Sequence, residues 1–361
     1  MAIVLKLAGF DPAHIHVVPS PLTEMMSLLH ALAEPDHHLE AKATLDDVSG
    51  AFDAGMLDEF RFFSPLWARF RCRLFFPLDP HTSALPHQLQ AILDLSMEQF
   101  MRLAAEGVHG YARPLPLPQE LLHDDSARQV FLDYCRARST TRFELAESLL
   151  ADPEAFRHRL ANFLLRAQDA FFGQEWVHVH EAIHRSVARA AAGIRTAGPA
   201  AVLSQLSSSA HGLPDLQEVR FDKLQQRTVH LGGRELVLVP SVHIGPHLTI
   251  KDTAGFPVVI HYAAQSVEEE RLGIRELRER LAALASEARM EIFRHLSAEP
   301  ITTSELALRL GQNPAQVSRS LGVLRDASLL VSERRGKLVY YRINTARVLN
   351  LGPDILSTLV R

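Results

Sequence analysis

The chain has 361 residues, of which 47% are hydrophobic and 22% charged, and its formal net charge is −4. This length predicts two or three domains with a sizeable core. Because every stretch of about 18 residues contains charged or turn residues, we expect no membrane span. The N-terminus is too short in its apolar part for a secretory signal, and Cys72 and Cys135 are too few for a disulfide scaffold, so we expect a cytoplasmic protein.

Charge is distributed unevenly along the chain. Residues 267–361 contain 15 Lys and Arg against 12 Asp and Glu, so 15 − 12 = +3, which leaves −4 − 3 = −7 for residues 1–266. Within 302–347 the count is 8 basic and 3 acidic residues, or +5. This asymmetry suits a small polyanion-binding module attached to a larger acidic body, although chance variation along a chain can produce it too.

The first two thirds of the chain mix strand and helix patterns. Residues 1–83 contain short strands such as IVLKLAGF and HLEAKAT, and helices near 22–33 and 51–63. Residues 85–208 carry apolar residues at three-and-four spacing, as in FRHRLANFLLRAQDAFF, which predicts helices. The segment PLPLP at 114–118 breaks this helical region.

Strand character returns before the C-terminal third. Residues 217–263 include RTVHLGGRELVLVPSVHI, with a GG turn between apolar runs, and FPVVIHYA after a DTAG turn. The following EEERLGIRELRERLAAL predicts a solvated connector helix, which places the domain boundary near 265–267. We therefore predict an α+β protein. We expect its mixed helical and β-strand N-terminal domain, residues 1–266, to be sensor-like or dimerising, with subregions 1–83, 84–210 and 211–266. A C-terminal domain covers residues 267–361.

The helices of the C-terminal domain follow from their end signals. LAALASEARMEIFRHLS has one apolar stripe, which predicts one amphipathic helix, or two with a break near Ser286. Thr302 or Thr303 can cap the short helix TSELALRLG, which ends at Gly311. Asn313 then caps a second helix whose first residue is Pro314, the position where proline fits best.

The second helix has an apolar and a polar side. Its inward residues repeat at i, i+4 and i+7, and its outer face is polar and mostly uncharged. A short helix, a tight turn and a second helix of this kind indicate a helix-turn-helix. The inward residues are Val317, Leu321 and Leu324; the outer face carries Gln316, Arg319 and Ser320, with Ala315 and Ser318 beside them.

A basic hairpin follows this helix. LLVSERRGKLVYYRI has two strands with apolar residues at alternate positions, and ERRGK is the expected turn, in which Gly336 supplies the positive-φ position. Its position directly after the second helix, the recognition helix of the helix-turn-helix, indicates a wing. Residues 267–361 are therefore predicted to form a winged helix-turn-helix. We expect Arg334, Arg335 and Lys337 to neutralise phosphates or reach the minor groove.

The region from Leu281 to Ile343 resembles ArsR-type winged-helix repressors. The resemblance lies in LAALASEARMEIFRHL, TTSELALRLGQNPAQVSRSLGVLRDASLL and the wing RRGKLVYYRI. It implies a homodimer that reads an inverted repeat in double-stranded DNA, with base contacts from the recognition helix and backbone contacts from Asn313 and the wing. The DNA-binding set that we expect is Thr303, Ser304, Asn313, Ala315, Gln316, Ser318, Arg319, Ser320, Arg334, Arg335 and Lys337.

This sequence departs from the ArsR pattern in several places. Ser320 stands where histidine is frequent, Gly322 where a longer side chain is usual, and Ser328 where the turn normally has glycine. The first departure alters base preference, and the other two reduce local stability. The family's metal-binding Cys-x-Cys pair is missing from TTSELALRL, and the tail after Arg347 has no histidine or cysteine. The resemblance therefore implies no metal sensor in the winged helix.

The rest of the chain resembles a poorly characterised domain found fused to ArsR-type winged helices. This similarity lies in VPSPLTEM, FFGQEWVHVHEAIHRSVARAAAGI and ELVLVPSVHIGPHLTI. It extends the resemblance over most of the chain but implies no ligand.

One motif suggests different chemistry. The segment HEAIH is a literal HExxH, in which His180 and His184 would bind zinc and Glu181 would activate water. However, Val187 stands where a metzincin-like pattern has glycine, and only the remote Asp215 offers a third ligand. Nineteen histidines also make chance matches common. We therefore predict no catalytic residue, no cofactor and no metal, and keep two alternatives: a zinc metallopeptidase-like protein with an accessory DNA-binding domain, and a non-catalytic metal site at His178, His180 and His184.

Other clusters are weaker candidates. Three histidine pairs could bind a ligand, two cysteines could form a redox switch, and the aromatic residues around Trp67 could line a pocket, but buried thiols and aromatic cores are the commoner outcome. The pairs are His14 with His16, His37 with His38 and His243 with His247; the aromatic residues are Phe60, Phe62, Phe63, Phe70, Phe75 and Phe76. We predict a DNA-binding repressor controlled by an unknown effector, with an unregulated DNA-binding or scaffolding protein as a further alternative.

Overall fold

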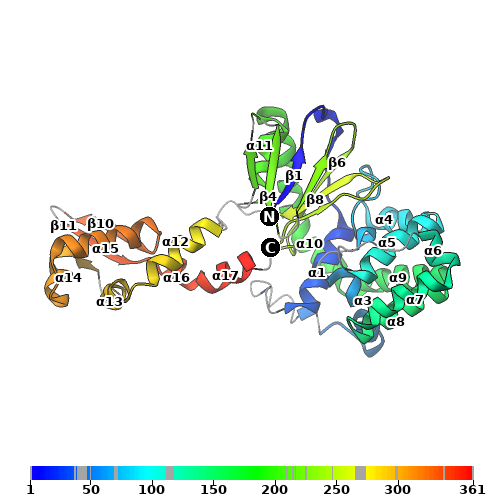
Figure 1. The fold of residues 1–361 in the computed structure, drawn as a ribbon, viewed down its shortest axis with the longest axis horizontal. Helices are drawn as coiled ribbons and strands as arrows, with labels where there is room; N and C mark the ends of the chain where they lie inside the picture. The colour runs from blue at the N-terminus through cyan, green and yellow to red at the C-terminus, as the bar shows by residue number, and fades with distance from the viewer. Residues whose placement is uncertain are drawn as a thin grey trace. The chain divides into compact units, whose positions relative to one another are not determined.

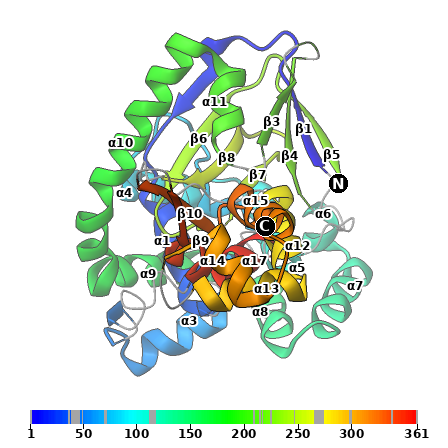
Figure 2. The same ribbon diagram turned by 90° about the vertical axis from the view of Figure 1, so that its left-hand side faces the viewer.

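The computed structural model (Figures 1 and 2) describes residues 2–35, 38, 47–48, 50–68, 72–110, 118–207, 210–213, 215, 217–223, 226–245, 247–264, 274–296, 300–335 and 338–359. The chain divides into two compact units, Met1–Glu269 and Glu270–Val360. The boundary expected at 265–267 lies outside the described residues. No helix among the described residues is long and apolar enough to cross a membrane.

Two four-stranded sheets lie in the N-terminal unit. The first has the order β3-β4-β1-β5, in which β1 is antiparallel to β4 and parallel to β5. The second has the order β2-β6-β8-β7, in which β2, β6 and β8 are parallel and β7 is antiparallel. The strands are β1 Ala2–Lys6, β2 Ile15–Val17, β3 Ala210–Leu213, β4 Glu218–Asp222, β5 Arg227–His230, β6 Leu236–Ser241, β7 Thr249–Lys251 and β8 Val258–Ala263.

The predicted strand region is confirmed, and its pairing is informative. The GG turn links β5 to β6, but these strands do not pair with each other, because β5 joins the first sheet and β6 the second. All six residues of β6 are buried. Val237 and Val239 belong to the apolar cluster that consists mainly of helix residues, whereas Leu236 and Leu238 belong to the cluster that consists mainly of strand residues. Burial on both faces explains why this strand is a continuous apolar run.

Helices make up most of the N-terminal unit, as the spacing predicted. Figure 1 shows α3 to α9 gathered together, while α10 and α11 pack on the strands. Six of the helices in this unit follow a Ser or Asp whose side chain accepts a backbone N–H. The helices are α1 Pro21–Ala33, α3 Ala54–Trp67, α4 Leu85–Leu93, α5 Met97–His109, α6 Pro118–His123, α7 Asp125–Arg136, α8 Thr140–Ala151, α9 Pro153–Ala167, α10 Gly173–Ala197 and α11 Pro199–Gln205.

The aromatic cluster forms the core between these helices. Trp67 is fully buried and stacks on Phe163, with ring centroids 5.6 Å apart. Phe60, Phe63, Phe75 and Phe76 belong to the same apolar cluster. These side chains are therefore packing residues. Phe62 is only partly buried, and Phe70 and most of HLEAKAT lie outside the described residues.

The C-terminal unit is a winged helix-turn-helix. Because helices and sheets occur in both units, the predicted α+β class is confirmed. Its sheet has the order β10-β11-β9, and the helix break expected near Ser286 separates α12 from α13. The sequence analysis did not foresee β9, which pairs with Tyr340 and Tyr341. The elements are α12 Ile274–Leu284, α13 Glu287–Leu296, β9 Ile301–Thr302, α14 Thr303–Leu310, α15 Pro314–Asp326, β10 Leu330–Arg335, β11 Leu338–Ile343, α16 Thr345–Leu349 and α17 Leu351–Leu359.

Candidate functional site

The recognition helix α15 is positioned by its cap and its apolar side. The Asn313 side chain accepts a hydrogen bond from the Ala315 N–H at 2.8 Å, and Pro314 is the first helical residue. Val317, Leu321 and Leu324 are fully buried in the core of the unit. Gly311 ends the preceding helix with φ +62°, a conformation that glycine adopts without steric cost. The turn and the buried stripe together fix which side of α15 faces solvent.

The exposed side of α15 carries the residues predicted to contact bases. Ser320 is half-buried, and the other four members are exposed: Ala315, Gln316, Ser318 and Arg319. On the same unit, Arg309 and Arg325 pair with Glu305 and Asp326. Arg319, in contrast, has no ion-pair partner among the described residues. Its guanidinium is therefore available to an external anion or base edge.

The remaining predicted contacts lie on α14 and the wing. Thr302 is the N-cap of α14 and accepts from the Glu305 N–H at 3.3 Å; Thr303 is half-buried and Ser304 exposed. Strand pairing in the wing continues to Arg335, opposite Leu338. Residues 333–335 thus belong to β10 and not to the expected turn, because the cross-strand pairing extends further than the alternation suggested.

Basic side chains of the wing are only partly within the described residues. Arg334 is exposed, whereas the side chain of Arg335 and residues 336–337 lie outside them. Arg342 on β11 is also exposed and has no described ion-pair partner. The sequence analysis did not include Arg342, although its place in an alternating strand beside a basic turn was a usable signal. The individual DNA contacts of all these residues remain predictions.

Two departures from the ArsR pattern can be examined directly. Ser328 has φ +59°, the left-handed conformation that favours glycine. A side chain added at Gly322 would meet open space, so no packing requires glycine there. Both observations agree with the expected local cost in stability.

Sequence comparison identifies both units. The family described as "Family of unknown function (DUF5937)" matches residues 1–268, which is most of the chain. The chain belongs to this family. A helix-turn-helix domain family matches residues 284–333, the segment that contains α14 and α15. We refer below to the N-terminal unit as the DUF5937 domain.

Similar proteins extend this result for the C-terminal unit. The HTH-type transcriptional regulator NmtR of Mycobacterium tuberculosis is 34% identical over 71 residues, which is 20% of this chain and 59% of NmtR. Among solved structures, an ArsR-like transcriptional regulator from Rhodococcus sp. RHA1 is 29% identical, covering 22% of this chain and 74% of that one (TM-score 0.21). A homodimeric winged helix-turn-helix domain from Mycobacterium bovis is 26% identical, covering 25% and 86% (TM-score 0.21). The helix-turn-helix family match and the similarity to NmtR confirm the ArsR-type resemblance of this unit.

The HEAIH motif of the DUF5937 domain lies on α10. Glu181 is 73% exposed and pairs with Arg185 one turn later. The His180 Nδ1 contacts the Val177 carbonyl at 2.8 Å, and the rings of His180 and His184 are 6.3 Å apart. Among the described residues, no third metal-binding side chain joins these two histidines. The geometry therefore lacks the ligand set that a zincin requires.

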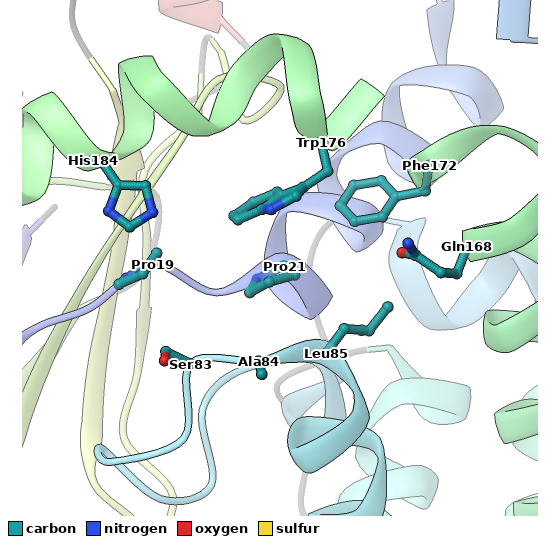
Figure 3. A pocket seen from close by; sticks show the side chains of 9 residues that line it. All are labelled: Pro19, Pro21, Ser83, Ala84, Leu85, Gln168, Phe172, Trp176 and His184. Carbon is teal, nitrogen blue, oxygen red and sulfur yellow. The ribbon is translucent and has the colours of Figure 1, made fainter. Parts of the chain in front are cut away.

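A pocket adjoins the motif (Figure 3). Its volume is about 340 Å³, and His184 lies at one side of it while Trp176 and Phe172 lie at the other. Gln168 and Phe172 come from a π-helical turn, Gln168–Phe172, that joins α9 to α10. No carboxylate occurs among the described residues that line this pocket. Its apolar lining suits packing against a hydrophobic group better than hydrolysis of a peptide.

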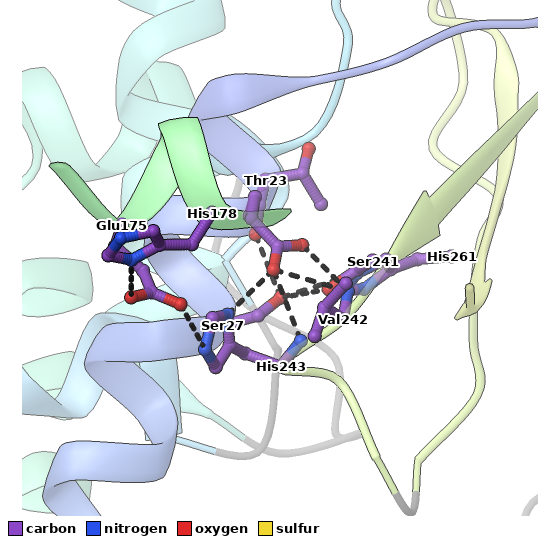
Figure 4. Close-up of polar contacts among 9 residues, drawn as sticks. Thr23, Ser27, Glu175, His178, Ser241, Val242, His243 and His261 are labelled. Carbon is purple, nitrogen blue, oxygen red and sulfur yellow. Dashed lines mark hydrogen bonds and ion pairs between the residues drawn. The ribbon is translucent and has the colours of Figure 1, made fainter. Parts of the chain in front are cut away.

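A buried network of carboxylates and histidine joins α1, α10 and the loop after β6 (Figure 4). Glu24 is fully buried and accepts hydrogen bonds from the N–H groups of Val242 and His243, each at 3.1 Å. The His243 ring lies between two carboxylates: its Nδ1 is 2.7 Å from Glu24 and its Nε2 is 3.2 Å from Glu175. Both ring nitrogens thus face acceptors, as an imidazolium requires.

The titration of this network follows from its geometry. Burial lowers the pKa of His243, but hydrogen bonds and charges from Glu175 and Glu24 outweigh burial and raise this pKa to about 9. Burial raises the pKa of Glu175, yet contacts with His243 and His178 lower it overall. Sequence analysis missed Glu24 and Glu175, because an acid in the first turn of a helix is ordinarily a partner of the helix dipole.

Neither cysteine has the surroundings of a reactive thiol. Both are free and buried. Burial raises the pKa of Cys72 to about 12 and that of Cys135 to about 11. Since the thiolate is the reactive form, neither suits a redox switch.

Proposed function

We propose that this protein is a sequence-specific, DNA-binding transcriptional repressor that acts in the cytoplasm and is controlled through its DUF5937 domain. The observation that carries the proposal is the exposed outer face of α15, with Gln316 and Arg319 projecting from a helix whose opposite side is buried. Bidentate contacts of glutamine to adenine and of arginine to guanine are available to such a face in the major groove. We assign no catalytic role to Glu181, which is exposed and paired with Arg185.

A homodimer is part of the proposal. The winged helix presents one recognition helix, and two copies reading an inverted repeat need their helices about 34 Å apart. Ile274 and Leu281 on α12 support a contact between copies, because they are 41% and 40% exposed and lie seven residues apart on one side of the helix. Repression then follows from occupancy of the operator.

Control by the DUF5937 domain is supported by the connectivity. β8 is a buried strand of the second sheet and ends at Ala263, and the next described helix, α12, begins at Ile274. A change at the carboxyl end of β8 is therefore close in sequence to the helix that we place at the dimer contact. Such a change would alter the separation of the two recognition helices and hence operator affinity.

Footprinting of the DNA upstream of the protein's own gene tests this proposal. We expect a protected inverted repeat, and we expect Gln316→Ala or Arg319→Ala to weaken binding to it by about 5- to 150-fold, with a much smaller loss on random DNA. Arg325→Ala is the matched control, since Arg325 lies on the same helix but pairs with Asp326. Its effect should be small on both DNAs.

Two results would count against the proposal. Failure to find any protected sequence in footprints at moderate salt would remove specific DNA binding. Equal losses on operator and random DNA for both variants would reassign these side chains to backbone contacts, which carry no sequence information.

A further inference from the structure

Three histidines from separate segments converge in the DUF5937 domain. His30 lies in the last turn of α1, His38 follows that helix, and His247 lies in the loop between β6 and β7. The ring centroids are 5.1 Å apart for His30 and His38, 5.2 Å for His30 and His247, and 5.6 Å for His38 and His247. One ring nitrogen of each lies within 4.8 Å of those of the other two. We call these residues the histidine triad.

One nitrogen-to-nitrogen distance within the triad matches a metal site, and the other two are no longer than 4.8 Å. The Nε2 atoms of His30 and His247 are 3.3 Å apart. Two zinc–nitrogen bonds of about 2.05 Å at a tetrahedral angle place their nitrogens about 3.3 Å apart, whereas an octahedral site brings them to about 3 Å. Imidazole nitrogen is a ligand that Zn²⁺ prefers. We propose that the histidine triad binds one Zn²⁺ ion in the DUF5937 domain.

The supporting structure holds these ligands in place. The loop that carries His247 is fixed to α1 by the hydrogen bonds from Val242 and His243 to Glu24, and the His247 N–H donates to Ile244 at 2.8 Å. His30 lies on the same helix as Glu24. One rigid helix therefore supplies a ligand and also anchors the loop that supplies another, as a preorganised metal site requires.

The exposure of the three histidines and the number of ligands indicate that the bound ion can be reached from solvent. His30 and His38 are 1% and 5% exposed, whereas His247 is half-buried and leaves an approach from solvent. The three ligands found among the described residues leave a fourth tetrahedral position, which a further donor such as water can occupy. The triad lies beyond the carboxyl end of β6, which runs parallel to β8, the edge where α/β sheets commonly hold ligands. The site is independent of the proposed DNA binding.

The proposal can be tested with the full-length protein and zinc alone. Protein stripped with chelator and titrated with ZnCl₂ should bind one equivalent, measured by elemental analysis after gel filtration and by competition with a chromophoric chelator. His247→Gln should weaken binding by at least about 100-fold, the upper end of the loss for a mere supporting residue. His38→Gln should behave in the same way. The control is a double variant of the other histidine pair, His180→Gln with His184→Gln, which should bind like wild type.

The coordination geometry gives a second readout. Co²⁺ in the site should show the visible absorption of tetrahedral cobalt in wild type and in the control, and lose it in His247→Gln. Circular dichroism and tryptophan fluorescence at native-like values would show that each variant is folded. Absence of zinc binding by wild type would overturn the proposal, as would undiminished binding by folded His247→Gln and His38→Gln. Loss of binding in the control alone would assign zinc to α10.

Discussion

Replacing Glu24 with glutamine removes one of the two carboxylates that hold the His243 imidazolium. Glu24 is fully buried, and its oxygens accept two backbone N–H groups as well as the His243 Nδ1–H at 2.7 Å. Glutamine keeps the size but loses the charge and offers one acceptor oxygen in place of two. Breaking a buried ion pair in this way should lower the free energy of unfolding of the DUF5937 domain by about 3–5 kcal/mol.

The pH dependence follows from the two altered pKa values. The folded-state pKa of His243, about 9, is above its unfolded value of 6.5, so its contribution is complete below pH 6.5 and is lost as pH rises toward 9. The difference between these two pKa values corresponds to about 3 kcal/mol in the free energy of unfolding. Glu175 has a lowered pKa, so its contribution is present above 4.5 and is lost as pH falls through its folded-state pKa. The network is therefore most stabilising between pH 4.5 and 6.5.

Tryptophan fluorescence isolates this domain during urea unfolding. The two tryptophans of the chain, Trp67 and Trp176, both lie in the DUF5937 domain. Unfolding curves of wild type and Glu24→Gln at several pH values from 5 to 9, with chelator present, should show a lower stability and a flatter pH profile for the variant. Glu181→Gln is the matched control, because Glu181 is 73% exposed, and should change the stability by less than about 0.5 kcal/mol.

The reasoning would be refuted if Glu24→Gln had a stability as close to wild type as the control. An unchanged loss of stability between pH 6.5 and 9 in the variant would also contradict the assignment of that loss to the Glu24–His243 contact. If the free energy of unfolding differed between variant and wild type by the same amount at every pH, the variant would have lost hydrogen bonds without a charge effect.

Three further predictions concern the winged helix. Changing Arg334, Arg335 and Lys337 together to alanine should weaken binding to all DNA sequences and reduce the slope of log affinity against log salt by about 0.9 for each phosphate that the variant no longer neutralises; an unchanged slope in a salt titration would remove the wing from the interface. Ser328→Gly should stabilise the domain by about 0.5–1 kcal/mol, because φ is +59° there, and a lower melting temperature by circular dichroism would contradict this. Gly322→Ala should add about 1 kcal/mol in the same assay, since the new methyl meets open space, and a loss of stability would reveal a hidden contact.

Local signals were sufficient for the winged helix. The Asn313 cap, Pro314 at the first helical position and Gly311 at the end of the preceding helix all act within a few residues of one another. Capping and turn preferences depend on such short spacings, so the sequence alone predicted both ends of α14, the start of α15 and the outer face of the recognition helix. The resemblance to ArsR-type proteins, in turn, implied that Ser328 occupies a position suited to glycine, as its φ of +59° shows.

Pairings across long separations needed the tertiary structure. The apolar runs on either side of the GG turn predicted β5 and β6 as strands, but such runs contain no information on strand partners, and the two strands join different sheets. His243 and His247 read as one pair in the sequence. In the folded protein His243 contacts Glu24 and Glu175, while His247 joins His30 across 217 positions of the chain. Periodicity shows which face of an element is buried, whereas the partner on that face depends on how the whole chain packs.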